Sequence, residues 1–118
     1  MKLYGITQCD TVKKARTWLA SKRQNIPFHD FKKAGIEREL LERWLDRVEW
    51  HDLVNKKGTT WRQLNEAEKE AVKDRDSAIE LMLKKPSVIR RPILESKNRI
   101  VVGFDETVYS EFFQNEHA

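Results

Sequence analysis

The chain has 118 residues, of which 39% are hydrophobic, so it is large enough for one domain with one modest core. Its 23 Lys and Arg residues against 19 Asp and Glu residues give a net charge of +4, and this even mixture argues against a dedicated nucleic-acid-binding surface. No apolar stretch is long enough to cross a bilayer, and the first residues lack the apolar segment of a signal peptide, so we expect no membrane association and a cytoplasmic location.

The chain begins with a strand, helix and strand pattern. Residues 2–5 form a short apolar run typical of a strand, residues 11–23 repeat apolar positions at helical spacing, and Phe28 with Phe31 indicates a second strand. Because a helix between two strands in so short a span predicts a right-handed crossover, we expect these two strands to be parallel.

The only cysteine, Cys9, comes directly before the predicted first helix. A cysteine at a helix start lies near unpaired backbone N–H groups and the positive end of the helix dipole, and both favour the thiolate. Lys13, Lys14 and Arg16 act in the same direction, and because cations in the first turns oppose the dipole, they predict an anionic partner. The alternative is that Cys9 is an inert small side chain beside a solvated charged face.

The middle of the chain, from about residue 35 to residue 85, is predicted to be helical. Its clearest helix is expected to start at Gly35 and to reach Val48, because apolar residues form one stripe opposite charged residues. A loop is predicted over residues 55–60. This block separates two parts of the chain that read as strands.

Two further helices are expected inside the same block. Asn65 followed by Glu68 resembles a capping box and predicts a short helix through about Lys73. Asp76 is expected to cap the next helix, which Pro86 ends.

The last third of the chain predicts a hairpin with strands over residues 88–94 and 100–102, then a helix capped by Asp105 and a frayed tail over residues 114–118. The whole order predicts an α/β fold, namely a thioredoxin-like βαβ-ββα mixed sheet with a helical insertion between the two halves, in a single domain. Three residues are expected on the inner face of the last helix: Val108, Phe112 and Phe113.

Four segments carry a family resemblance, and their order and separation are more specific than any one of them. They are YGI at residues 4–6, CDTVKKAR at 9–16, RRPI at 90–93 and VVGF at 101–104. Together they resemble the arsenate-reductase-like (ArsC/Spx) family of the thioredoxin fold, which includes glutathione-coupled arsenate reductases, Spx-type transcriptional regulators and YffB-type proteins. The YffB-type subgroup fits best.

The resemblance implies a catalytic thiolate at Cys9 and a cis peptide bond before Pro92. It also implies that the backbone before Pro92 turns toward the cysteine, where an extended thiol substrate can pair with it. Arsenate-reducing members hold the oxyanion with three arginines, and only Arg91 matches one of these positions. The other two positions fall at about Asn55 and Val102, so arsenate would lose two charge-assisted contacts.

The resemblance to Spx-type regulators lacks one feature, because those proteins use a Cys-x-x-Cys pair and the residue three after Cys9 is Val12. Any oxidised state of Cys9 must therefore be resolved by a thiol from another molecule. Glutathione is the abundant candidate, so we predict an enzyme: a glutathione-dependent thiol oxidoreductase that acts on small thiol and disulfide substrates, with glutathione as co-substrate and glutaredoxin as a further partner.

Besides the catalytic Cys9, the expected site residues are Arg91, Pro92, Thr11, Arg90, Lys13, Lys56 and Asn55. The arginines and lysines would hold glutathione carboxylates, and the Thr11 hydroxyl would donate to the sulfur. The three histidines lack ligand spacing and no glycine-rich phosphate loop occurs, so neither a metal nor a nucleotide is expected. Two alternatives stay open: an arsenate reductase coupled to glutathione and glutaredoxin, and an Spx-like regulator that binds RNA polymerase without catalysis.

Overall fold

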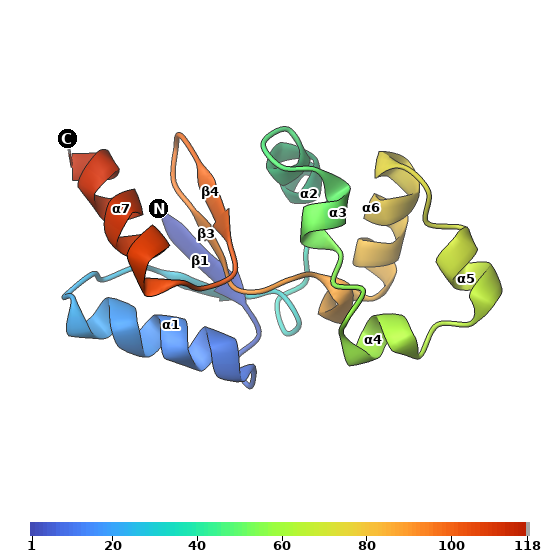
Figure 1. Cartoon of the computed structure of the whole chain (residues 1–118), viewed down its shortest axis with the longest axis horizontal. Coiled ribbons are helices and arrows are strands. Elements are labelled where there is room, and N and C mark those ends of the chain that lie inside the picture. Colours follow the sequence, from blue (N-terminus) through green and yellow to red (C-terminus); the bar gives the residue numbers. More distant parts are fainter. Residues whose placement is uncertain (118) are drawn as a thin grey trace. The chain divides into compact units, whose positions relative to one another are not determined.

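The computed structural model describes residues 1–117, with side chains to residue 115, and divides the chain into two compact units (Figure 1). Residues 1–30 and those from 91 onward form one unit, called the sheet unit here, and residues 31–90 form the other, the helical unit. The predicted helical insertion at about residues 35–85 falls inside the helical unit. None of the described helices combines the length and apolarity needed to cross a bilayer.

The sheet unit contains one four-stranded mixed sheet with the strand order β2-β1-β3-β4. As predicted, the first two strands are parallel and the later strands form an antiparallel hairpin, although the strand predicted from residue 88 starts at Ile93. The predicted thioredoxin-like fold class is thus confirmed. The elements are β1 (Lys2–Gly5), α1 (Asp10–Ser21), β2 (Phe28–Asp30), β3 (Ile93–Glu95), β4 (Ile100–Val102) and α7 (Glu106–His117).

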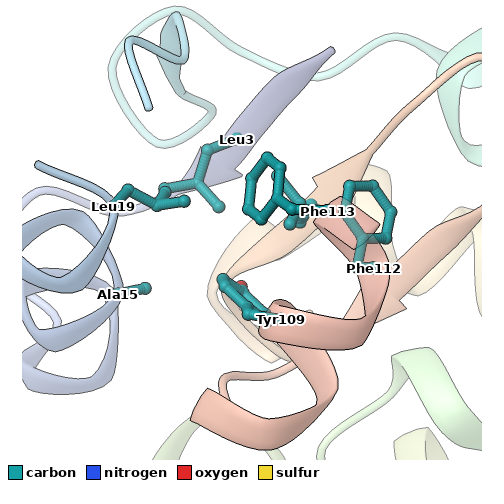
Figure 2. Packing of buried hydrophobic residues seen from close by; sticks show 7 residues of the cluster. Leu3, Ala15, Leu19, Tyr109, Phe112 and Phe113 are labelled. Atoms are coloured by element: carbon teal, nitrogen blue, oxygen red, sulfur yellow. The ribbon is translucent and has the colours of Figure 1, made fainter. Parts of the chain in front are cut away.

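One row of side chains crosses the sheet at a single register position and forms the floor of the core. Leu3 pairs with Phe28 on one side and with Leu94 on the other, and Leu94 pairs with Val101. Helices α1 and α7 contribute the side chains that cover this row (Figure 2). Each fully buried Leu or Phe side chain stabilises the fold by about 1.5 to 3 kcal/mol. The covering residues are Ala15, Leu19, Tyr109, Phe112 and Phe113.

Gly5 allows the first helix to start close to the first strand. A Cβ placed on Gly5 would lie 2.7 Å from Cγ2 of Val12, which is fully buried in the first turns of α1. Real Cβ atoms do not approach so closely, so a larger residue at position 5 would push the helix away. The close approach fixes where the residues between β1 and α1, including Cys9, are held.

The helical unit is built around the apolar faces of two amphipathic helices. Leu41, Trp44 and Leu45 form the buried stripe of the first, at the spacing of one helix face. The fully buried side chains of this unit include Phe31, Leu53, Ile79, Met82 and Ile89. The elements are α2 (Arg38–Leu45), α3 (Trp50–Leu53), α4 (Thr59–Arg62), α5 (Glu66–Glu70), α6 (Arg75–Lys84) and a 3₁₀ turn over Pro86–Val88.

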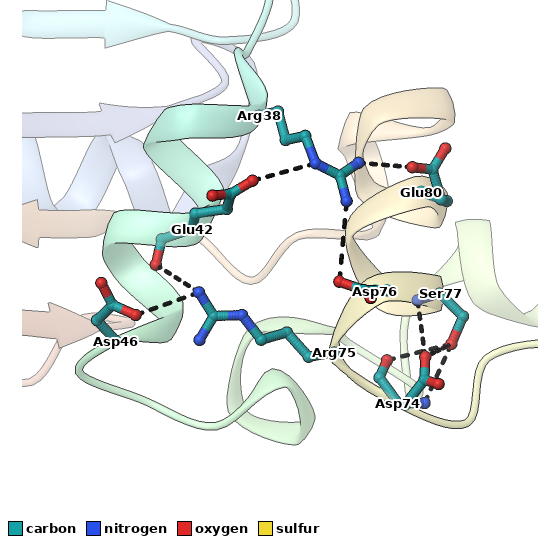
Figure 3. A network of polar contacts seen from close by, with 8 residues as sticks. All are labelled: Arg38, Glu42, Asp46, Asp74, Arg75, Asp76, Ser77 and Glu80. Atoms are coloured by element: carbon teal, nitrogen blue, oxygen red, sulfur yellow. Dashed lines mark hydrogen bonds and ion pairs between the residues drawn. The ribbon is translucent and has the colours of Figure 1, made fainter.

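Two arginines link the polar sides of α2 and α6 (Figure 3). Arg38 in α2 contacts the carboxylates of Glu42 at 3.1 Å, Glu80 at 2.6 Å and Asp76 at 3.8 Å. Arg75 in α6 reaches back to the Asp46 carboxylate at 3.1 Å. Each exposed pair is worth little alone, but the shared guanidinium is ordered once for three partners.

The helix boundaries in the middle of the chain differ from the predictions at two capping residues. The helix predicted to start at Gly35 starts at Arg38, because Gly35 has φ +83° and lies outside the helix. The prediction that Asp76 caps α6 is wrong, since Asp74 is the N-cap and forms a capping box with Ser77. Asp76 lies two residues further on, inside the first turn of α6, and its carboxylate is 3.8 Å from the Arg38 guanidinium.

The predicted caps of two other helices are confirmed, whereas two details of the last helix differ from the predictions. The predicted box of Asn65 and Glu68 is confirmed, although its helix ends at Glu70. Asp105 accepts the Val108 N–H over 3.0 Å, which confirms it as a cap, whereas the Val108 side chain is 38% exposed and does not face inward as predicted. The tail predicted to fray from residue 114 is helical to residue 117, and residue 118 lies outside the described residues.

Candidate active site

The strand directions bring several chain segments to one edge of the sheet. The carboxyl ends of β1, β2 and β4 meet the start of β3 there, because β1 and β2 are parallel while β3 and β4 alternate in direction. The loop to Cys9 leaves β1 at this edge, Asp30 ends β2, Pro92 precedes β3 and Gly103 follows β4. Residues distant in sequence are thus gathered where the only cysteine lies.

Cys9 is the N-cap of α1, as its predicted position at the helix start requires. Its backbone is extended, with φ −76° and ψ 127°, and its carbonyl accepts the first helical hydrogen bond from the Lys13 N–H at 2.9 Å. The side chain is half-buried, is not in a disulfide, and makes no hydrogen bond to the helix. The first-turn N–H groups, which have no helical acceptor, are therefore adjacent to a sulfur that can become an anion.

The loop that carries Cys9 is anchored by a pair that the sequence pattern does not reveal. Thr7 donates both its N–H, at 3.1 Å, and its hydroxyl, at 2.6 Å, to the Asp30 Oδ2 atom. The Cys9 N–H then donates to the Ile6 carbonyl at 3.1 Å. An aspartate at the end of a strand parallel to the one preceding Cys9 is the signal that could have found this contact. The anchor fixes the turn immediately before the thiol.

Pro92 is preceded by a cis peptide bond, as predicted, and is buried. Its carbonyl accepts the Gly103 N–H at 2.8 Å, and the Gly103 carbonyl in turn accepts the Tyr109 hydroxyl at 3.0 Å. Burial raises the pKa of Tyr109, so this hydroxyl keeps its proton and remains a donor. Gly103, directly after β4, thereby connects the proline to the buried Tyr109 of α7.

The other predicted site residues of the sheet unit are Thr11, Lys13 and Arg91. Thr11 and Lys13 are exposed on the first turns of α1, and Arg91 is half-buried directly before Pro92. In the described part of the chain, the Thr11 hydroxyl makes no hydrogen bond, to Cys9 or to any other group. The roles of these three side chains toward a ligand remain predictions.

Asn55, Lys56 and Arg90 belong to the helical unit, where they border a short backbone pairing. The Asn55 N–H donates to the Val88 carbonyl at 2.8 Å, and the Arg90 N–H donates to the Leu53 carbonyl at 2.7 Å. Asn55 also accepts the Lys57 N–H with its side-chain oxygen at 3.1 Å. The Asn55 side chain thus closes a turn of its own loop.

Lys56 lies between two tryptophan rings. Its ammonium is 5.4 Å from the ring centre of Trp50 and 5.3 Å from that of Trp61. Two such contacts restrict a long side chain that is otherwise free to move, and each is worth about 0.5 to 1 kcal/mol at an exposed position. The charge of Lys56 is evident from the sequence, but its position beside two tryptophan rings is not.

No group of three or more His, Cys, Asp or Glu side chains within residues 1–115 is arranged to hold a metal ion. The chemistry that the described residues offer at the sheet edge is that of a thiol, a cis-proline backbone and nearby cations. Of these groups, the thiol is the one that thiol–disulfide exchange requires, since its thiolate is the attacking species.

Comparisons with known proteins agree with this fold along nearly the whole chain. The ArsC family model matches residues 4–112. The solved structure of the YFFB protein has a TM-score of 0.88 and 50% identity, covering 92% of this chain and 95% of that chain. An arsenate reductase (ArsC) related protein from Brucella melitensis has a TM-score of 0.75 and 45% identity, covering 97% and 96%. The global transcriptional regulator Spx of Streptococcus pyogenes is 26% identical, covering 98% of this chain and 86% of the relative.

Proposed function

The chain belongs to the ArsC family, and on that premise we propose that it is a glutathione-dependent thiol oxidoreductase whose nucleophile is the Cys9 thiolate. The observation that carries the proposal is the position of Cys9. This lone, half-buried cysteine caps α1 at the sheet edge that also holds the cis-proline, Pro92. Helix-start cysteines in such surroundings are the ones that react.

The reaction has two exchange steps. In the first, the Cys9 thiolate attacks the glutathione sulfur of a mixed disulfide, so that the substrate leaves as a thiolate, takes up a proton, and a Cys9–glutathione disulfide forms. In the second, another glutathione thiolate attacks the same glutathione sulfur, which releases oxidised glutathione and restores the Cys9 thiolate. The two electrons that reduce the substrate therefore come from glutathione.

Two features of the chain support an external thiol as the second reactant. Cys9 is the only cysteine, and Val12, at the position three residues later, is fully buried against Gly5. No internal thiol can resolve the mixed disulfide. A cytoplasmic setting, where glutathione keeps thiols reduced, suits this requirement.

The remaining site residues have roles in binding under this proposal. Arg91 and Lys13 would hold glutathione carboxylates through charge-assisted contacts, and Thr11 would donate its hydroxyl to the sulfur. Arg90 and Lys56 of the helical unit are the further cations proposed for the carboxylates. Glutaredoxin is the expected protein partner.

Mass spectrometry of the intact reduced protein with oxidised glutathione tests the proposal. We expect one glutathione adduct on the wild type, its removal by added reduced glutathione, and no adduct on the Cys9→Ser variant. In a coupled assay with glutathione reductase, the wild type should consume NADPH with a small mixed disulfide as substrate. A wild type that forms no adduct, or whose adduct reduced glutathione does not remove, would refute the proposal.

Arsenate reduction is a second candidate, favoured by the 45% identity to an arsenate reductase related protein. It would begin with the same attack by Cys9 but needs cations for the oxyanion. At the two positions where the resemblance places further arginines, Asn55 closes its own turn and Val102 pairs with Ile93 in the sheet. We therefore expect no turnover with arsenate, glutathione and glutaredoxin, and a measurable rate would favour this candidate.

A regulator that binds RNA polymerase is the third candidate, and it follows from the similarity to a global transcriptional regulator. A pull-down from cell extract distinguishes it. Retention of polymerase by both wild type and Cys9→Ser would favour the regulator, whereas loss of thiol exchange in the variant without polymerase binding favours the enzyme.

A further inference from the structure

A groove in the sheet unit runs beside α1; it shares Lys13 with the residues proposed to hold glutathione, and its other lining residues have no role in the proposed chemistry at Cys9. It encloses about 460 Å³ and is lined on one side by α1 and on the other by the residues that lead into α7. From α1 it receives Lys14, Thr17 and Trp18, and from the opposite side it receives Phe104 and Glu106. The α1 residues recur at the spacing of one helix face, so they present a continuous wall.

The floor of the groove is aromatic and fixed in orientation. The ring of Trp18 stacks on Phe113 at a centroid distance of 6.3 Å and meets the edges of Tyr109 at 5.8 Å and Phe104 at 6.2 Å. Trp18 is half-buried and the Lys22 ammonium lies 5.7 Å from its ring centre, so only part of this side chain is open to a ligand. A rigid, partly exposed indole offers an apolar surface that loses little entropy when a ligand covers it.

The rim of the groove is charged, and neither ion pairs nor helix stability explains why its lysines are there. Lys13 and Lys14 are exposed, and their side chains have no ion-pair partner within the described residues. They lie in the first turns of α1, where a cation opposes the helix dipole. Glu106 on the other wall is in the first turn of α7, where a carboxylate is favoured, so helix stability accounts for Glu106 but not for the lysines.

The Trp18 end of the groove is too far from the thiol to be reached by glutathione, whereas Lys13, also in its lining, lies one helical turn from Cys9. Trp18 follows Cys9 by nine residues of helix, which corresponds to about 13 Å along the axis. An extended chain whose glutathione-linked cysteine lies beside Cys9 needs about four residues to span that distance. Glutathione has only one residue on each side of its cysteine, so only a longer chain can occupy both places.

We infer that this groove binds a segment of a protein partner in which an aromatic or aliphatic residue is flanked by acidic residues, about four residues from the partner's reactive cysteine. The apolar side chain covers Trp18 and Phe104, and the carboxylates face Lys13 and Lys14. This inference rests on the proposed function, because it names the class of protein disulfide that Cys9 would receive. The lysines of the groove select the acidic residues of the segment, and its aromatic side chains select the apolar residue.

The test separates binding from thiol chemistry. The protein is the Cys9→Ser variant, and the probe is a fluorescein-labelled peptide with Ser in place of its cysteine and Glu-Phe-Glu centred four residues away. Fluorescence anisotropy should show saturable binding. Lys14→Ala should weaken it about three- to fivefold, and Thr17→Glu, which adds a repelling carboxylate at an exposed position of the wall, should weaken it by more than about tenfold.

Matched controls decide between the groove and general charge attraction. Lys84→Ala removes an equal charge from an exposed position of the helical unit and should leave the affinity unchanged. A probe with Ser in place of Phe should bind several-fold more weakly. The inference would be overturned if adding Thr17→Glu to the Cys9→Ser protein left the affinity unchanged, or if the Phe and Ser probes bound with equal affinity.

A second measurement distinguishes failure of the groove from failure of the proposed function. Wild-type protein is mixed with oxidised glutathione and with the cysteine form of the probe as a glutathione disulfide. Faster exchange with the probe, lost in Thr17→Glu while exchange with oxidised glutathione persists, supports the inference. If Cys9 reacts with neither, the proposed function fails, and the anisotropy result still decides whether the groove binds the segment.

Discussion

The Gly103 N–H donates to the Pro92 carbonyl over 2.8 Å, and this bond joins the end of β4 to the cis-proline at the start of β3. Gly103 has φ +90°, a conformation that a residue with a Cβ adopts only at a cost, although the space around it is open. The geometry beside the proposed nucleophile therefore depends on backbone conformation rather than on packing at this position.

Gly103→Ala is expected to destabilise the fold by about 1 to 2 kcal/mol, because an Ala at this φ is strained. Relief of that strain would move the N–H away from Pro92, so the exchange of Cys9 with oxidised glutathione should also slow. Urea denaturation and the rate of adduct formation measure the two effects.

Gly35→Ala is the matched control, since Gly35 has φ +83° and an equally open surrounding but lies in the helical unit. It should lower stability by a similar amount and leave the exchange rate of Cys9 unchanged. Equal exchange rates in both variants would show that the Gly103 to Pro92 bond has no part in positioning the site.

Thr7→Val is expected to slow Cys9 exchange several-fold, because it removes the 2.6 Å hydroxyl bond to Asp30 that holds the turn before the cysteine. A bond to a carboxylate contributes about 1.5 to 3 kcal/mol. The Cys9 amide, bonded to the Ile6 carbonyl, should also exchange its hydrogen faster. Thr7→Ser keeps the donor and should behave like wild type in both measurements, and a Ser variant as slow as the Val variant would contradict this role.

Gly5→Ala and Val12→Ala test whether the close approach of α1 to β1 sets the helix position. Gly5→Ala should cost about 1 to 3 kcal/mol, since its Cβ would meet Cγ2 of Val12 at 2.7 Å. Val12→Ala alone should cost about 2 kcal/mol by leaving a cavity. The double variant should be less destabilised than the sum, because the smaller side chain makes room for the new methyl group. Additive losses in urea denaturation would mean that the two sites do not share this contact.

Local signals explain why the start of the chain and the capping boxes could be predicted. The apolar run of the first strand, the helix after Cys9 and the box of Asn65 with Glu68 each depend on residues a few positions apart. Asp76 was a misleading signal because Asp74 also stands near the helix start, and only Asp74 has Ser77 at the third helical position to complete the box.

The anchors of the candidate site depend on tertiary structure and could not be predicted in the same way. Thr7 and Asp30 meet because two parallel strands end together, and their separation in sequence is 23 residues. The bond from Tyr109 to Gly103 needs α7 to lie against the sheet. The cis bond before Pro92 was predicted only through the family resemblance, since a proline alone does not indicate it.

Asp74 gives a prediction about pH. The hydroxyl of Ser77, at 2.6 Å, and then its N–H, at 2.9 Å, donate to the Asp74 carboxylate and hold its pKa below the ordinary value of 3.8. A carboxyl whose pKa is lower in the folded state adds stability above its unfolded pKa and loses this contribution as the pH falls through the folded pKa.

Asp74→Asn keeps a cap but cannot ionise. Wild type should therefore unfold a few degrees above Asp74→Asn at pH 7, and this gap should close as the pH falls below 3.8. Thermal unfolding followed by circular dichroism from pH 7 downward measures the gap, with Asp76→Asn as the control that leaves the N-cap intact. A gap that stays constant with pH would mean that ionised Asp74 does not contribute to the cap.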